Sequence, residues 1–233
     1  MDYLSRIKPL YGIDTLQGCG EPEIEAMRGR FGVLPQAVEE FYRAAAKTEA
    51  FHHVQDSWVL PEQYEKWTWL GKTDALILLV ENQGVCFAGI LREDLERPDP
   101  PVYVSYGRRD QGSWQLWAKD AGDWDLCAGS TTEFFAAALA YEAAFTFSWE
   151  PQEFYWYTQE EKAVLSSRLT KLPFALKNWC SEMEITLYQN APDNLLALMS
   201  FRGEEEPQAL YGAVTEESYR KLLKVVGEMG EPV

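Results

Sequence analysis

The sequence predicts an α+β fold, with an antiparallel or mixed twisted sheet, helices grouped on one side of it, and a C-terminal α/β extension. Two apolar runs around a short turn, within residues 75–91, predict a β-hairpin. Two stretches with helical spacing of apolar residues precede it, and a helix-capping sequence follows the next strands. Because the helices flank a meander of strands and do not alternate with them, a layered α+β class is favoured.

Two helices are predicted before the hairpin. Residues 21–30 carry acids in the first turn, where the helix dipole favours them, and Gly32 ends this helix. Pro35 suits the start of the next helix, over 35–47, since its missing N–H has no partner there. A short helix or turn follows at 61–67. The expected inward residues of the two long helices are Ile24, Met27, Phe31, Val38, Phe41, Tyr42 and Ala45.

The central strands are predicted from alternation and turns. Residues 75–81 and 85–91 form the hairpin around an Asn-Gln-Gly turn, and 102–106 alternate as a third strand. Residues 114–118 and 124–128 flank an acidic turn and are expected to pair with each other as a second hairpin.

The last third of the chain mixes helices and strands. Capping boxes at 130–133 and 158–161 predict helices to about 145 and 171. Three strands are expected at 183–188, 195–201 and 209–214, and a helix that begins at Thr215. The predicted organisation is an irregular leader (1–20), a main domain (21–147) and an extension (148–233), which either joins the first sheet or forms a second module.

The charge of the chain limits the classes of partner that it can bind. The net charge is −16, with 13 basic and 23 acidic residues up to position 147 and 8 and 14 after it, so acidity belongs to the whole molecule. Such a field repels nucleic-acid phosphates and anionic lipids. We therefore expect no binding to nucleic acid or membrane; the acidity serves either solubility or a basic protein partner.

The cysteines and the first residues point to a reducing compartment. Cys19, Cys86, Cys127 and Cys180 are widely spaced with no Cys-x-x-Cys pair, which is typical of buried thiols. The first residues lack the basic and apolar regions of a signal peptide. We expect a cytoplasmic protein.

Few residues offer catalytic or metal chemistry. The two histidines, His52 and His53, are adjacent and cannot share a helix or strand face, and no other ligand stands at metal-binding spacing to them. The same scarcity disfavours Ser-His-Asp and Cys-His sites. The sequence also lacks the phosphate-loop, dinucleotide and nucleophile-elbow motifs, and the acids at 120–125 lack EF-hand spacing. We expect no enzyme, no metal and no cofactor.

Two aromatic stretches indicate recognition. Residues 114–117 with Trp124, and residues 154–157, hold more large rings than one inward face accommodates. Exposed Trp and Tyr beside carboxylates are typical of a binding hot spot for a basic partner. The alternative is that these rings join the two halves of the chain.

Several short motifs occur in a characteristic order. They are an acidic helix at 25–31, Gly-Val-Leu-Pro at 32–35, Val-Glu-Glu-Phe-Tyr at 38–42, Glu-Asn-Gln-Gly-Val at 81–85, Phe-Ala-Gly-Ile at 87–90, Asp-Pro-Pro-Val at 99–102, Trp114, and Thr-Thr-Glu-Phe-Phe at 131–135. The set resembles the SMI1/KNR4 (SUKH) family over about residues 21–147. Ala88 stands where the family often has Trp, and residues 148–233 lie outside the resemblance.

This resemblance implies a function. Bacterial members are frequently immunity proteins against toxins, many of them nucleases, and fungal members act as interaction hubs in cell-wall synthesis and signalling. A nuclease toxin needs a basic cleft, which a carboxylate-rich surface can occupy. We therefore expect a non-catalytic antitoxin that binds a basic, nuclease-type toxin directly; the alternative is an intracellular interaction or regulatory module of the same type without a toxin partner.

The expected partner contacts lie on the two hairpins. Each candidate also has a structural explanation, such as turn chemistry for Asn82, core packing for the tryptophans and solvation for the acids. The oligomeric state stays open. The candidates are Glu81, Asn82, Gln83, Trp114, Trp117, Asp120 and Asp123.

Overall fold

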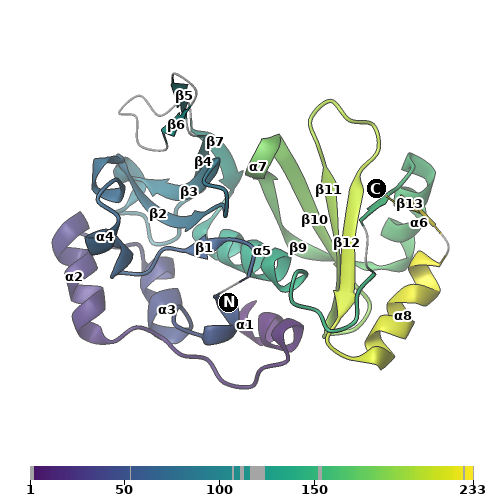
Figure 1. Cartoon of the computed structure of the whole chain (residues 1–233). Coiled ribbons are helices and arrows are strands. Elements are labelled where there is room, and N and C mark those ends of the chain that lie inside the picture. Colours follow the sequence, from purple (N-terminus) through teal and green to yellow (C-terminus); the bar gives the residue numbers. More distant parts are fainter. Residues whose placement is uncertain are drawn as a thin grey trace. The chain divides into compact units, whose positions relative to one another are not determined.

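The computed structural model is an α+β protein with two main antiparallel sheets (Figure 1). It divides into two compact units, which we name the five-stranded unit (Leu16–Phe135) and the six-stranded unit (Met1–Thr15 and Ala136–Val233). The division falls inside helix α5 (Thr131–Ala143). The structure describes residues 3–52, 54–106, 108–110, 113–115, 124–151, 154–227 and 229–232.

The boundaries of the two compact units differ from those of the predicted domains (1–20, 21–147 and 148–233). The domain division stays a prediction. The leader is not irregular as expected: helix α1 (Tyr3–Ile7) and the 3-10 helix η1 (Lys8–Tyr11) fold within the six-stranded unit. Their apolar residues recur at helical spacing, and Ile7 and Leu10 are buried. The segment is helical because this spacing places its apolar side chains on one buried face.

The five-stranded unit contains one antiparallel sheet in the order β1-β2-β3-β4-β7, with a separate β5-β6 ribbon. The predicted helices before the hairpin and the hairpin itself are confirmed. The elements are α2 (Glu21–Phe31), α3 (Gln36–Ala44), η2 (Glu49–Phe51), β1 (Ser57–Trp58), α4 (Gln63–Lys66), η3 (Leu70–Lys72), β2 (Ala75–Val80), β3 (Cys86–Leu91), η4 (Arg92–Asp94), β4 (Val102–Tyr106), β5 (Arg108–Asp110), β6 (Ser113–Gln115) and β7 (Asp125–Ala128).

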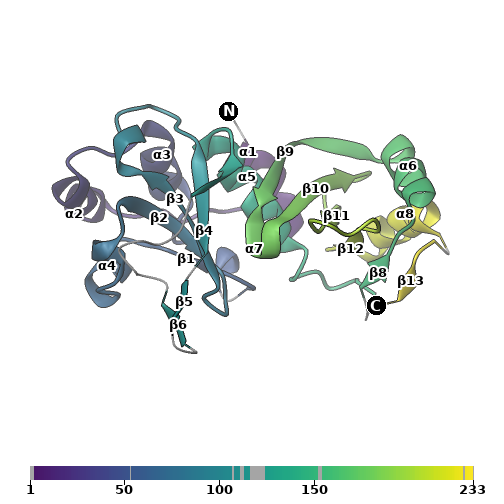
Figure 2. The ribbon, with the colours of Figure 1, turned by 90° about the horizontal axis from the view of Figure 1, so that it is seen from above.

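The core of this unit lies between the sheet and the helices that pack on one of its faces (Figure 2). Phe41 of α3 stacks on Phe135 of α5, with ring centroids 4.1 Å apart. Trp58 of β1 contacts both rings. Burial of each such ring stabilises the fold by about 2–3 kcal/mol.

The predicted hairpin of residues 114–118 with 124–128 is wrong in its pairing. Strand β6 pairs with β5, and β7 pairs with β4 through Val102 and Ala128. Cys127 and Ala128 are buried there, so β7 gains more apolar burial as a strand of the main sheet than it would in an isolated ribbon. The expected turn at 120–123 lies outside the described residues.

The six-stranded unit has a sheet of its own, so the C-terminal strands do not extend the first sheet. Its strand order is β13-β8-β12-β11-β10-β9, and every described pairing is antiparallel. The three strands predicted after residue 180 are confirmed. After α5, the elements are β8 (Tyr155–Trp156), α6 (Gln159–Arg168), β9 (Thr170–Asn178), α7 (Trp179–Glu182), β10 (Met183–Gln189), β11 (Asn194–Ser200), β12 (Gln208–Ala213), α8 (Glu216–Val226) and β13 (Glu231–Pro232).

Strand β9 was not predicted, and the helix before it ends at Arg168, short of the expected residue 171. Pro173 lies inside this strand. It is tolerated because β9 is an edge strand, where proline removes no ladder bond from a central position. Leu172, Phe174 and Leu176 alternate inward along it.

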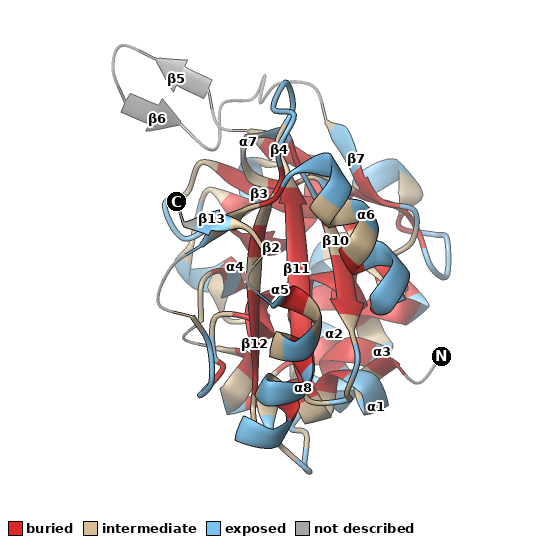
Figure 3. Cartoon of the chain, turned by 90° about the vertical axis from the view of Figure 1, so that its right-hand side faces the viewer, coloured by how far each residue is buried: buried red, intermediate tan, exposed pale blue. Residues whose placement is uncertain are grey.

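Helices α6 and α8 contribute to the core on one face of the second sheet, whose middle strands are buried (Figure 3). The capping box of α6 is complete, and Thr215 caps α8 by accepting the Ser218 N–H. The box predicted at α5 is half formed: the Ser130 hydroxyl accepts the Glu133 N–H, but the Glu133 carboxylate accepts the Gly129 N–H.

The cysteines are thiols, not disulfides. Three are buried, and Cys180 is half-buried. In the part of the chain that the structure describes, no helix combines the length and apolar character needed to cross a bilayer.

Candidate functional site

The turn between β2 and β3 borders a groove in the five-stranded unit. The groove has a volume of about 330 Å³ and combines two tryptophans with polar groups of the turn. Three of the predicted contact residues therefore lie together at one surface. The lining residues are Ser57, Trp67, Trp69, Val80, Glu81, Asn82, Gln83 and Gly84.

The predicted residues at this turn have different surroundings. Glu81 is only 7% exposed, and one oxygen of its carboxylate accepts the backbone N–H of Gln83 at 2.9 Å and of Val85 at 3.2 Å. The backbone N–H of Asn82 donates to Asp56. The Asn82 and Gln83 side chains are exposed. Glu81 thus shapes the turn, and the two amides face solvent from it.

The predicted tryptophan and aspartate contacts cannot be placed beside this turn. Trp114 lies in β6, whose side chains are not described. Trp117, Asp120 and Asp123 lie outside the described residues. Their partner contacts stay predictions.

A row of rings flanks the groove, and of these rings only Trp124 belongs to an aromatic stretch that the sequence singled out. Trp67 and Trp69 lie nearly parallel, with centroids 6.4 Å apart, and Trp69 packs on Phe87. Trp124 meets the same Phe87 edge-on at 5.5 Å. Two tryptophans close together at 67–69 are a signal in the sequence that could have indicated this surface. Trp124 joins it only in the folded protein, through Phe87 of β3.

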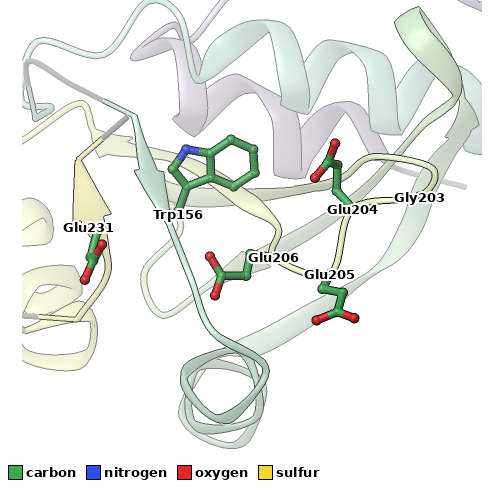
Figure 4. A pocket seen from close by; sticks show the side chains of 6 residues that line it. All are labelled: Trp156, Gly203, Glu204, Glu205, Glu206 and Glu231. Carbon is green, nitrogen blue, oxygen red and sulfur yellow. The ribbon is translucent and has the colours of Figure 1, made fainter.

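A second hollow, in the six-stranded unit, surrounds the indole of Trp156 with carboxylates (Figure 4). Its volume is about 430 Å³. Glu206 turns toward the strand that bears Trp156, whereas Glu205 points away from the ring. The lining residues are Trp156, Gly203, Glu204, Glu205, Glu206 and Glu231.

Strand alternation places the indole in this hollow. Tyr155 and Tyr157 pack with the core under α6 and α8, so Trp156 between them faces the opposite side of the sheet. Trp156 stands opposite Gln208 of β12 and Glu231 of β13. This explains how consecutive aromatics are accommodated: they divide between the two faces, and Phe154 is exposed.

The loop between β11 and β12 brings the other carboxylates. It is closed by the Glu204 N–H, which donates to the Phe201 carbonyl at 3.1 Å. The Gln159 side chain of α6 donates to the Glu205 carbonyl and ties the loop to that helix. Arg202 is engaged with Glu182.

The hollow is lined by glutamates. Among the described residues, no lysine or arginine forms an ion pair with Glu204, Glu205, Glu206 or Glu231. Carboxylates beside an indole face suit an ammonium or guanidinium group, through charge-assisted hydrogen bonds and cation–π attraction. No group of three or more described His, Cys, Asp or Glu residues is arranged to hold a metal ion.

The sequence pointed to one part of the hollow only. Residues 154–157 stood out as aromatic, but the acids at 204–206 and 231 did not, because acids are abundant along the whole chain. Comparison with known proteins found no family model, no curated protein and no solved structure that matches the chain. The function is therefore inferred from the chemistry of the two surfaces.

Proposed function

We propose that the protein is a non-catalytic binding protein that neutralises a basic, nuclease-type toxin by direct contact. The observation that carries this proposal is the hollow in which Trp156 is surrounded by glutamates without a cationic partner in the described chain. A lysine or arginine of the partner would find both an aromatic face and carboxylate acceptors there.

The charge of the whole chain supports the same partner. A net charge of −16 attracts a basic surface over a Debye length and accelerates association. A toxin that cleaves nucleic acid needs a basic cleft for phosphates, and occupation of that cleft by carboxylates blocks it. The same field repels nucleic acid and anionic membranes, so a protein is the favoured partner.

The proposal includes membership of the SMI1/KNR4 family over about residues 21–147. Two helices, an antiparallel meander and a closing helix follow in the order that the resemblance implies. Residues 81–85, which carry the Glu-Asn-Gln-Gly-Val motif, form the turn beside the tryptophan groove. The thiol state of the cysteines supports a cytoplasmic location.

The test is co-expression of the protein with the product of the neighbouring reading frame, followed by capture at low and high salt. We expect recovery of a basic protein whose toxicity is suppressed, with weaker capture at high salt. Recovery of a non-toxic basic partner would favour the interaction module instead. Failure to recover any basic partner at either salt concentration would contradict both.

A further inference from the structure

Strand β13 is one of the two edge strands of the sheet in the six-stranded unit, and it forms one wall of the hollow. It contributes two residues, Glu231 and Pro232, which pair with Trp156 and Tyr155 of β8. Glu231 is the residue of this strand that lines the hollow. We name residues 229–232 the strap.

The strap is fastened by a side chain from a distant helix. The backbone N–H of Gly230 donates to one carboxylate oxygen of Glu161 at 3.0 Å. The other oxygen of Glu161 accepts the backbone N–H of Thr158 at 2.9 Å and completes the capping box of α6. One carboxylate thus joins the start of α6 to the strap. The N–H groups of Gly230 and Thr158 hold the pKa of Glu161 below its usual value.

Close approach of the strap to β8 requires glycine at position 230. Its φ is +85°, and a Cβ there would lie 3.0 Å from Cζ of Tyr157 and 3.1 Å from the Trp156 carbonyl oxygen. Gly227, at the C-cap of α8, also has a positive φ of 57°. Both turns of the chain that lead into the strap therefore depend on a conformation that favours glycine.

The strap covers the backbone of Trp156. The Tyr157 N–H donates to Pro207 on the β12 side, and backbone groups alternate along a strand, so the N–H and C=O of Trp156 face β13. Release of the strap would expose this edge and remove the Glu231 carboxylate from the hollow. A two-residue strand at the edge of a sheet is held by few bonds and opens at a low free energy.

We propose that Glu161 is a latch that fastens the strap, and that the strap opens and closes one wall of the Trp156 hollow while the rest of the sheet stays folded. Opening of the strap would let a side chain of the partner enter the hollow, and this last step rests on the proposed function.

Amide hydrogen exchange of the full chain without a partner, followed by NMR, tests the latch. Glu161→Gln and Gly230→Ala should each accelerate exchange of the Trp156 amide by about tenfold, while Ala197 in β11 is unchanged. Thr158→Val removes the hydroxyl cap but keeps the Glu161–Gly230 bond, so it should accelerate only amides of α6. Glu160→Gln, an exposed neighbouring acid, should match the wild type.

Two results would overturn the latch. One is an unchanged Trp156 amide in both Glu161→Gln and Gly230→Ala. The other is equal acceleration of Trp156 and Ala197, because the strap would then open only with the whole sheet. Since no partner is present, failure here is distinct from failure of the toxin-binding proposal, which the capture experiment tests separately.

Discussion

Trp156 and Glu231 stand directly opposite each other on strands β8 and β13, although they lie far apart in the sequence. Cross-strand pairs share a face, so the indole and the carboxylate line the same hollow. The sheet thus creates an aromatic and anionic surface that neither segment has alone. This pairing is the physical basis for a site that receives a cationic side chain.

In the turn between β2 and β3, Glu81 is buried and structural, whereas Asn82 and Gln83 are exposed. Glu81→Ala should lower the free energy of unfolding by about 1–3 kcal/mol, because its carboxylate accepts two backbone N–H groups. Asn82→Ala with Gln83→Ala should leave stability within about 0.5 kcal/mol of the wild type. Urea unfolding measures both. If the turn contacts the partner, only the double variant loses affinity without losing stability.

Gly18 and Gly29, both in the five-stranded unit, offer a test of packing because their surroundings differ. A Cβ on Gly18 would lie 1.8 Å from the Arg43 carbonyl oxygen, so Gly18→Ala should destabilise by about 3 kcal/mol. Gly29 in α2 has open space around it, and Gly29→Ala should stabilise by about 0.5–1 kcal/mol. Thermal unfolding compares them; a Gly18→Ala protein as stable as the wild type would refute this packing.

Asn194 is the buried polar centre at the start of β11. Its amide oxygen accepts the N–H groups of Asn190 and Ala191, and its NH₂ donates to the Ser218 carbonyl. Asn194→Ala should lower the free energy of unfolding by about 2–4 kcal/mol, because the buried Ser218 carbonyl and two partly buried N–H groups lose their partner. The exposed Asn190→Ala should cost less. If urea unfolding showed the same loss of stability for both variants, Asn194 would not be the centre of this hydrogen-bond network.

The stabilisation that Glu161 contributes to the fold depends on pH, because the pKa of its carboxyl is lowered in the folded state. The Gly230 N–H is the first cause of this lowering and the Thr158 N–H is the second. An unfolded glutamate titrates at about 4.3, so the stabilisation is complete above that pH and is lost as pH falls through the lower folded value. The stability difference between wild type and Glu161→Gln should therefore be largest at neutral pH and shrink as the pH falls through the lowered pKa of the folded state. A difference that stays constant in urea unfolding from pH 7 to 3 would be inconsistent with an ionised latch.

Local signals in the sequence predicted most of the fold. The hairpin of β2 and β3 followed from two apolar runs around an Asn-Gln-Gly turn, and the start of α6 from its capping box. Strand β9 was not predicted: the preceding helix was expected to run to residue 171, past the start of the strand. Pro173 fits this strand because β9 lies at the edge of the sheet. The pairing of β7 was wrong because proximity in sequence favoured β6, whereas burial favours β4.

The site was less predictable than the fold, because its parts come together through pairing between distant segments. The aromatic run at 154–157 was visible, but strand alternation decides that Trp156 leaves the core while Tyr157 enters it. Nothing local in the sequence brings Glu231 or the 204–206 loop to the same face.

Binding of the captured basic partner to hollow variants tests the central claim most directly. By titration calorimetry, Trp156→Ala and the triple change of Glu204, Glu206 and Glu231 to Gln should each weaken affinity by about tenfold or more. A control with the same charge change, Glu65, Glu93 and Glu96 to Gln, should weaken it by less than about threefold, through the long-range field alone. Equal losses in the hollow and control variants would contradict a specific site at Trp156.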